Sequence, residues 1–167
     1  MESDKQIQKL EAKIYSNRQR LRSQIQSLQE AGQSVVFTNG CFDILHRGHV
    51  EYLCRARSLG NALVMGVNSD ASVRGLKGEG RPIQTLEDRI RILAGLFCVD
   101  FLIPFDEQTP ESLLEELKPD IHTKGGDYSP ESLPESRVVQ SYGGRIVILP
   151  FLEGRSSSKI IEKSRKG

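Results

Sequence analysis

From Ser34 onward the chain alternates between short β-prone runs and longer segments whose apolar residues have helical spacing. The predicted strands cover residues 35–38, 62–67, 100–103, 120–123 and 145–149, and the predicted helices cover 46–59, 85–96, 110–117, 131–140 and 156–164. Strands and helices that alternate in this way form a parallel sheet with helices on both faces. We therefore expect an α/β fold, a Rossmann-like three-layer α/β/α domain with a five-stranded parallel sheet. Such folds bind ligands at the carboxyl ends of their strands.

The segment before Ser34 predicts a helical extension, residues 1–33, ahead of a domain formed by residues 34–167. Residues 3–29 are polar and free of glycine and proline, and apolar residues recur there at near-heptad spacing: Ile7, Leu10, Ile14, Leu21 and Leu28. This pattern predicts one long amphipathic helix. Because Asn17 and Gln24 interrupt the apolar seam, we expect the helix to pack on its own domain or across a homodimer.

Length, charge and cysteine content narrow the classes of protein. A chain of 167 residues suits one α/β domain, and a net charge of +1 gives no reason to expect a nucleic acid or a membrane surface as a partner. Three widely spaced cysteines without a CxxC pair argue against a disulfide framework or a zinc site. The N-terminus lacks an apolar signal core and no apolar run is long enough to span a membrane, so we expect a cytoplasmic protein.

Residues 35–49, VVFTNGCFDILHRGH, predict a phosphate site. The β-prone run ends in residues that tolerate a tight turn, namely Thr38, Asn39 and Gly40. A helix from about residue 46 places His46 and His49 on one face of its first turn, where free backbone N–H groups and the helix dipole already attract an anion. Gly48 would let a ligand approach closely. Two ordinary helix histidines, or a loose metal site, are the alternatives.

Residues 68–82 form a glycine-rich segment with three cations, Arg74, Lys77 and Arg81. Its spacing matches neither GxxxxGK[ST] nor GxGxxG. We predict a flexible loop whose Lys77 closes over a triphosphate, with a solvated surface loop as the alternative.

Two later segments are candidates for nucleotide contacts. Residues 124–128, KGGDY, follow a predicted strand, and their consecutive glycines would let a base or a ribose approach the backbone, although a plain β-turn explains them too. Ser156, Ser157 and Ser158 begin the last predicted helix, where hydroxyls either cap the helix or bind phosphate oxygens.

GCFDILHRGH resembles the GxFD…HxGH signature of the cytidylyltransferase-like nucleotidyltransferases. Four further blocks, VNSDASVRGLKGEGRPI, TLEDRIRIL, KGGDYSPESL and LPFLEGRSSSKII, are similar in order and spacing to the adenylyltransferase domain of bacterial heptose-phosphate enzymes. The resemblance covers roughly residues 34–163. It implies transfer of AMP from ATP to D-glycero-D-manno-heptose 1-phosphate, which makes ADP-heptose and pyrophosphate for lipopolysaccharide core biosynthesis.

The same resemblance implies roles for individual residues. The catalytic residues would be His46, His49 and Lys77. The nucleotide-binding residues would be Thr38, Asn39, Gly40, Phe42, Gly48, Arg89, Lys124, Gly125, Asp127, Ser156, Ser157 and Ser158, and the sugar-phosphate-binding residues would be Asn68 and Arg81. Mg²⁺ would arrive with the nucleotide, without direct protein ligands that we can name. Taken alone, Arg89 could equally pair with Asp88 or Glu87 on the helix surface.

The chain departs from the family pattern in two places. Ser156, Ser157 and Ser158 replace the usual Ser-Thr-Thr run, and residues 133–136 lack the glycine expected before a small residue. The second departure makes the sugar pocket less well defined than the nucleotide pocket. Asp43 is interpreted as a structural carboxylate that orients the turn.

Three alternatives to ADP-heptose synthesis remain. One is a CTP-dependent cytidylyltransferase for glycerol 3-phosphate or a related phospho-alcohol, although KGGDY in place of MGDDW favours adenylyl transfer. Another is a non-catalytic nucleotide-binding module. The third is a metal hydrolase that uses His46, His49 and His122, but these histidines lack a nearby glutamate and a convincing further ligand.

Overall fold

A computed structural model describes residues 2–150 and 157–165 of the chain. Its centre is a five-stranded sheet in the order β3-β2-β1-β4-β5, in which every neighbouring pair is parallel. The strands are β1 (Val35–Gly40), β2 (Ala62–Asn68), β3 (Phe101–Phe105), β4 (Ile121–Gly125) and β5 (Arg145–Leu149). The predicted parallel sheet and Rossmann-like fold are therefore confirmed.

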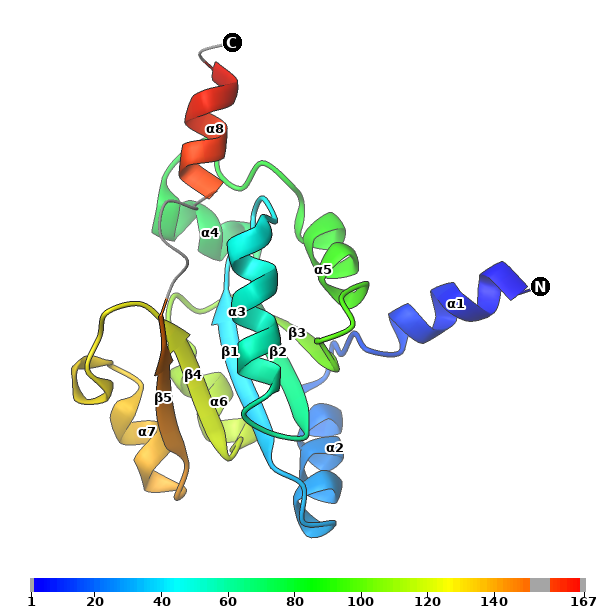
Figure 1. Cartoon of the computed structure of the whole chain (residues 1–167), viewed down its shortest axis with the longest axis vertical. Coiled ribbons are helices and arrows are strands. Elements are labelled where there is room, and N and C mark those ends of the chain that lie inside the picture. The colour runs from blue at the N-terminus through cyan, green and yellow to red at the C-terminus, as the bar shows by residue number, and fades with distance from the viewer. Residues whose placement is uncertain (1, 151–156, 166–167) are drawn as a thin grey trace.

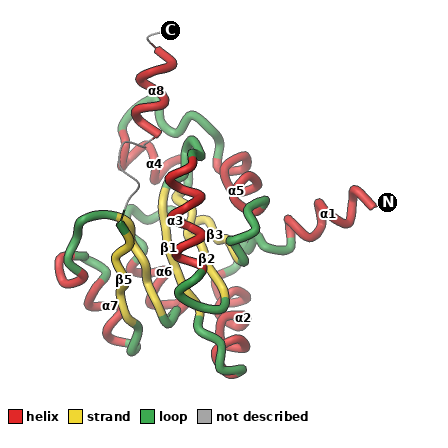
Figure 2. Tube along the Cα trace, viewed as in Figure 1, coloured by secondary structure: helices red, strands yellow, loops and turns green. Residues whose placement is uncertain are grey.

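Helices cover both faces of the sheet and make the three layers visible in Figures 1 and 2. One core cluster joins the sheet to α3 (Arg47–Arg57) and α5 (Leu86–Ala94), and the other joins it to α2 (Arg18–Glu30), α6 (Glu111–Leu117) and α7 (Ser136–Ser141). Figure 1 shows α3 crossing in front of the sheet and α6 behind it. Two further helices, α4 (Asp70–Lys77) and α8 (Ser157–Arg165), lie beyond the carboxyl ends of the strands.

Strand β2 shows why the sequence folds as a parallel sheet. Its run ALVMGVN is apolar except at the end and is buried at every position, which is typical of a strand covered on both faces. Leu63, Met65 and Val67 face the α3 side, whereas Val64 faces the α2 side. A Cβ atom at Gly66 would lie 3.0 Å from Cζ of Phe37, so the glycine makes room for that ring.

The prediction of one long N-terminal helix is wrong, because the helical segment breaks into α1 (Glu2–Glu11) and α2. Between them the backbone pairs with β3: the Tyr15 N–H donates to the Leu102 carbonyl, and the Leu102 N–H donates to the Lys13 carbonyl, both at 2.8 Å. Asn17 then caps α2 by accepting from the Arg20 N–H at 2.9 Å. Helix α2 packs on its own sheet, whereas α1 projects to the side (Figure 1).

The flexible loop predicted around Lys77 is instead the end of helix α4. Ser69 caps this helix, since its side chain accepts from the Ser72 N–H at 3.2 Å. The chain leaves the helix at Gly78 and turns again at Gly80, with φ angles of 88° and 83° that favour glycine. Lys77 therefore has a fixed backbone, followed by a short glycine-flanked turn.

The helix predicted over residues 131–140 is also divided. A short 3-10 helix, η1 (Pro130–Ser132), precedes α7. Leu133 between them is extended, with φ −80° and ψ 133°, as expected for a residue followed by proline. Pro134 thus shortens the helix and leaves Glu135 at its N-cap.

The strand order reverses between β1 and β4, which is where open α/β sheets form a ligand crevice at the carboxyl ends of their strands. From β1 the chain crosses through α3 to β2 on one side. From β4, the other neighbour of β1, it crosses through α7 to β5 on the opposite side. Connections that leave neighbouring strands in opposite directions open a ligand crevice at their carboxyl ends. Within the described part of the chain, every helix is too short or too polar to span a lipid bilayer.

Candidate functional site

Two stacked histidines mark the start of α3, directly after β1. His46 is the N-cap residue and His49 lies in the first turn, with their ring centroids 3.8 Å apart and an interplanar angle of 20°. The Phe42 ring packs edge-on against His49 at 5.1 Å, and Phe42 itself has a φ of 47°. A Cβ atom at Gly40 would lie 2.8 Å from the Phe42 ring. The two imidazoles lie together as predicted, but His46 is the extended N-cap residue and not part of the first helical turn.

Burial keeps His49 uncharged at neutral pH. Desolvation, and secondarily the neighbouring His46, lower the pKa of His49 to about 4. Its Nδ1 atom is buried without a hydrogen-bond partner among the described residues. A neutral imidazole has one N–H donor and one acceptor. In this state His49 can offer one hydrogen bond to a phosphate oxygen beside the positive end of α3.

Asp43 is the structural carboxylate that the sequence predicts, but it orients a segment distant in sequence. It is 1% exposed and accepts hydrogen bonds from Arg81 Nε at 2.6 Å, the Ile83 N–H at 2.8 Å and the Gln84 N–H at 3.0 Å. Burial alone would raise the pKa of Asp43, but these donors outweigh it and lower the pKa. Asp43 thus fixes Arg81 beside the histidine turn.

Arg89 is buried and holds three segments together. Its guanidinium donates to the Gln84 carbonyl at 3.1 Å, the Cys41 carbonyl at 2.6 Å and Asp70 Oδ1 at 2.7 Å. The alternative that Arg89 pairs with Asp88 or Glu87 on the helix surface is wrong, because its acidic partner is Asp70. Contact with nucleotide phosphates stays a prediction, and it would require the guanidinium to exchange partners.

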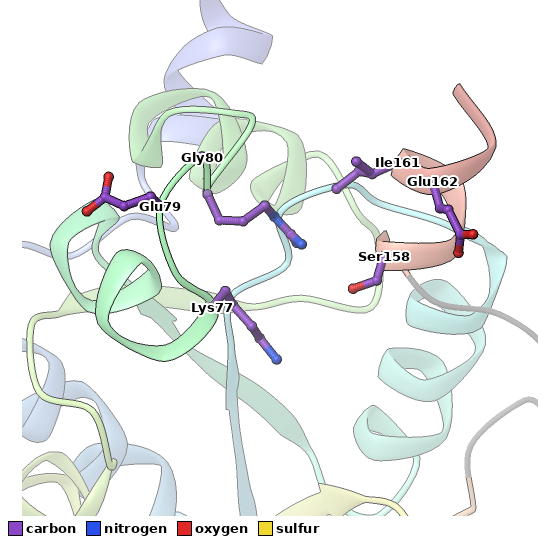
Figure 3. Close-up of a pocket in the computed structure, with 7 residues that line it drawn as sticks. Lys77, Glu79, Gly80, Ser158, Ile161 and Glu162 are labelled. Carbon is purple, nitrogen blue, oxygen red and sulfur yellow. The ribbon is translucent and has the colours of Figure 1, made fainter. Parts of the chain in front are cut away.

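A cavity of about 290 Å³ lies between the end of α4 and helix α8. Its lining residues are Lys77, Glu79, Gly80, Arg81, Ser158, Ile161 and Glu162 (Figure 3). Ser157 connects this wall to the histidine turn, because its hydroxyl donates to the Ile44 carbonyl at 2.9 Å. Ser156 lies outside the described residues. The structure therefore brings the predicted residues Lys77, Arg81 and Ser158 around one cavity.

Several other predicted residues lie at the carboxyl ends of β1 and β2. Thr38 is buried and its hydroxyl lies 2.8 Å from the Tyr52 hydroxyl. Asn39 Oδ1 is buried and has no hydrogen-bond partner within residues 2–150 and 157–165. Asn68 Nδ2 donates to Ser72 Oγ at 2.9 Å, which holds it to α4. Gly48 lies in the first turn of α3.

The KGGDY segment begins inside β4 rather than after it. Lys124 and Gly125 are the last two residues of β4. Gly126, which has a φ of 135°, follows, and its N–H donates to the Leu149 carbonyl at 3.0 Å. Asp127 follows and is exposed. Lys124 Nζ donates to Glu135 Oε1, a partner that the sequence did not predict.

His122 is separated from the histidine pair. Its ring lies 5.7 Å from that of Phe37, on the face covered by α2, α6 and α7, whereas α3 covers the opposite face. The three histidines therefore cannot bind one metal ion, and the metal hydrolase interpretation is wrong.

Sequence reasoning missed five residues at these sites, one of which is Gly80 in the turn after α4. Ile161 and Glu162 could have been predicted, because they follow Ser158 at helical spacings of three and four. Glu79 is one charge in a glycine-rich turn, and Glu135 is a single acid between Pro134 and Ser136. Their positions depend on tertiary contacts, so no local pattern indicates them.

A parallel sheet with a histidine pair at the start of its first crossover helix forms an α/β domain whose site suits the phosphate groups of a nucleotide. The family model described as cytidylyltransferase-like matches residues 37–163. The chain belongs to the cytidylyltransferase-like family, and it is a nucleotidyltransferase.

Curated relatives are similar over most of this chain. The bifunctional protein HldE of Geobacter sulfurreducens is 55% identical over 135 residues, which are 81% of this chain and 28% of the relative. The bifunctional protein HldE of Syntrophotalea carbinolica is 50% identical over 153 residues, which are 89% of this chain and 31% of the relative. The chain spans about a third of the length of these relatives.

Two solved structures are similar to this chain. The lipopolysaccharide core biosynthesis protein of Thermoplasma volcanium is 30% identical with a TM-score of 0.60, and the match covers 74% of this chain and 100% of that one. Pantothenate synthetase from Thermus thermophilus is 19% identical with a TM-score of 0.63, over 92% of this chain and 70% of that one. The second likeness concerns the fold alone.

Proposed function

We propose that this chain transfers AMP from ATP to D-glycero-D-manno-heptose 1-phosphate, giving ADP-heptose and pyrophosphate for lipopolysaccharide core biosynthesis. The observation that carries the proposal is the His46–His49 stack at the start of α3, beside the β1–β4 crevice. Similarity to proteins named HldE and to a lipopolysaccharide core biosynthesis protein supports the heptose branch of the family.

The chemistry requires positioning and charge more than a strong base. The attacking oxygen belongs to the sugar phosphate, which is already ionised at neutral pH. As this oxygen attacks the α-phosphorus in line, negative charge grows on the non-bridging oxygens and on the departing pyrophosphate. His46 and His49 would donate to these oxygens from the α3 end, and Lys77 would supply positive charge from the cavity.

The acceptor would lie on the β2 side of the crevice. Asn68 ends β2, and Arg81 lines the cavity next to Lys77. Asp43 accepts from Nε of Arg81, which leaves the two terminal nitrogens to bind the sugar phosphate. The nucleotide base and ribose would then occupy the β4 side, near Lys124 and Gly125.

Mg²⁺ would enter with ATP and neutralise phosphate charge. This ion prefers oxygen ligands and keeps several waters. Within the described ranges no group of three or more His, Cys, Asp or Glu side chains could hold a metal. The ion would be held mainly by the phosphates, beside Glu79 and Glu162, the carboxylates that line the same cavity.

The remaining parts of the proposal concern partners and location. Small phosphorylated molecules would be the substrates, and a cytoplasmic location would give the enzyme access to ATP. A homodimer and the absence of a nucleic-acid partner remain predictions, which light scattering and a DNA-binding assay would test.

A substrate panel tests the proposed function. Pyrophosphate release is measured with Mg²⁺ and ATP, CTP, GTP or UTP, each against both anomers of heptose 1-phosphate and against glycerol 3-phosphate. We expect turnover with ATP and a heptose 1-phosphate. Turnover with CTP and glycerol 3-phosphate would favour the cytidylyltransferase, and nucleotide binding without turnover on any acceptor would favour a non-catalytic module.

A further inference from the structure

A buried polar cluster at the carboxyl end of β4 contains two residues, His122 and Glu135, that take no part in the mechanism described so far. Glu135, at the N-cap of α7, accepts two hydrogen bonds on the same oxygen, Oε1. One donor is Nε2 of His122, at 3.2 Å, and the other is the ammonium of Lys124. His122 and Lys124 lie two residues apart in β4, so both side chains leave the strand on the same face.

The carboxylate in this cluster is almost inaccessible. Glu135 is 1% exposed and His122 is 0% exposed, whereas the Lys124 side chain is 28% exposed. A buried carboxylate is costly unless charged or polar partners compensate it. Burial alone would raise the pKa of Glu135, but the hydrogen bonds from His122 and Lys124 and the charge of Lys124 lower it to about 2. Glu135 is therefore ionised at neutral pH.

His122 orients this carboxylate without adding a charge. Burial lowers the pKa of His122, so its ring is neutral. Because an ionised carboxylate only accepts hydrogen bonds, Nε2 of His122 carries the proton and donates a hydrogen bond to Oε1 of Glu135. The cluster thus has one negative charge, on Glu135, and one positive charge, on the partly exposed Lys124.

The position of Lys124 relates the cluster to the nucleotide crevice. Phe37 of β1 pairs in register with His122 of β4, so Lys124 lies two residues further toward the carboxyl ends of these adjacent strands. The histidine pair follows β1 at the same edge of the sheet. A nucleotide with its phosphates at α3 would extend toward β4 with its ribose and base.

We propose that Glu135 is a positioning residue, which fixes the Lys124 ammonium at the ribose-and-base end of the ATP site. This inference rests on the proposed function and adds to it a residue that acts through Lys124. The Lys124 ammonium would be fixed in one position by its hydrogen bond to Glu135. Its remaining N–H groups would then point toward the nucleotide. Without Glu135 the long lysine side chain would sample other rotamers, and ATP binding would have to order it.

The test is a double-mutant cycle with Glu135→Gln and Lys124→Met, in which KM is measured separately for ATP and for heptose 1-phosphate. Each single variant should raise the KM for ATP about tenfold, the order expected for loss of one charge-assisted hydrogen bond. The KM for heptose 1-phosphate and kcat should change less than about twofold. The double variant should match Lys124→Met, because Glu135 acts only through that residue.

The matched control is Glu131→Gln, which changes an exposed glutamate of η1 and should leave both KM values unchanged. A change in the KM for heptose 1-phosphate instead, or effects that add in the double variant, would overturn the proposal. If Glu135→Gln fails to fold, Lys124→Met decides, since an unchanged KM for ATP in that variant also overturns it. If the wild-type protein turns over no substrate, the proposed function fails, and the same cycle is read from ATP dissociation constants by calorimetry.

Discussion

His49 combines a partly buried position with a titratable ring, and this makes the stability of the fold depend on pH. The pKa of His49 is about 4 in the folded chain and about 6.5 in an unfolded one. Between these values the unfolded chain binds a proton that the folded chain does not. The free energy of unfolding should therefore decrease as the pH falls from about 6.5 to about 4.

Urea unfolding at pH 7.5, 6.5, 5.5 and 4.5 measures this dependence. His49→Gln should show a smaller loss of stability across the window than the wild type. Buried His122, whose pKa is also lowered, should account for part of the loss that remains. An identical pH dependence in the two proteins would contradict the assignment.

Asp43 is the residue that holds the segment of Arg81 in place, so its removal should destabilise the fold. Asp43→Ala leaves the Arg81 guanidinium and two backbone N–H groups without their acceptor. Breaking a buried ion pair in this way costs about 3–5 kcal/mol. Chemical denaturation of Asp43→Ala and of Asp106→Ala, which removes an exposed carboxylate, checks the prediction. Equal unfolding free energies would contradict it.

Helix α2 belongs to the core, although its sequence is largely polar. Leu21 and Ile25 are fully buried and pack with Val35 and Phe37 of β1. Leu21→Ala should therefore lower the free energy of unfolding by about 2–5 kcal/mol. Leu76→Ala is the matched control, because Leu76 is 43% exposed on α4 and should change stability by less than about 1 kcal/mol. Similar effects of the two substitutions would show that α2 is dispensable to the core.

Predictions from sequence succeeded where one local pattern determines an element. The five strands are short apolar runs bounded by turn residues, and the histidine pair depends only on local sequence, with His46 at the N-cap of α3 and His49 in its first turn. The helix break near residue 14 depends on backbone pairing with Leu102, far along the chain. Helix α4 was missed because Gly75 and Gly78 suggested a loop, whereas Ser69 caps a helix there.

Long-range side-chain partners could not be predicted in the same way. Arg89 was assigned to phosphate or to neighbouring acids, but it is buried against Cys41 and Asp70. Glu135 pairs with Lys124 only because Pro134 interrupts the helix and places it at the α7 N-cap. Such contacts depend on how distant segments pack, so a single sequence gives their residue types and not their partners.

The whole molecule assembles its candidate site from segments that are far apart in sequence. The parallel sheet places the ends of β1, β2 and β4 along one edge, and α4 and α8 enclose a cavity beyond it. Asp43 and Arg89 hold the segment between α4 and α5 against the histidine turn. Under the proposed function, the order of the sheet would separate an acceptor side at β2 from a nucleotide side at β4.

The most direct measurement follows ATP labelled at its α-phosphorus, incubated with Mg²⁺ and heptose 1-phosphate. The account predicts that the label enters ADP-heptose while unlabelled pyrophosphate is released. His49→Ala should slow this transfer by about 10²–10³-fold, the usual effect of losing one preorganised donor, and should retain the fold by circular dichroism. Label found only in free AMP or in unreacted ATP, or full activity of His49→Ala, would contradict the account.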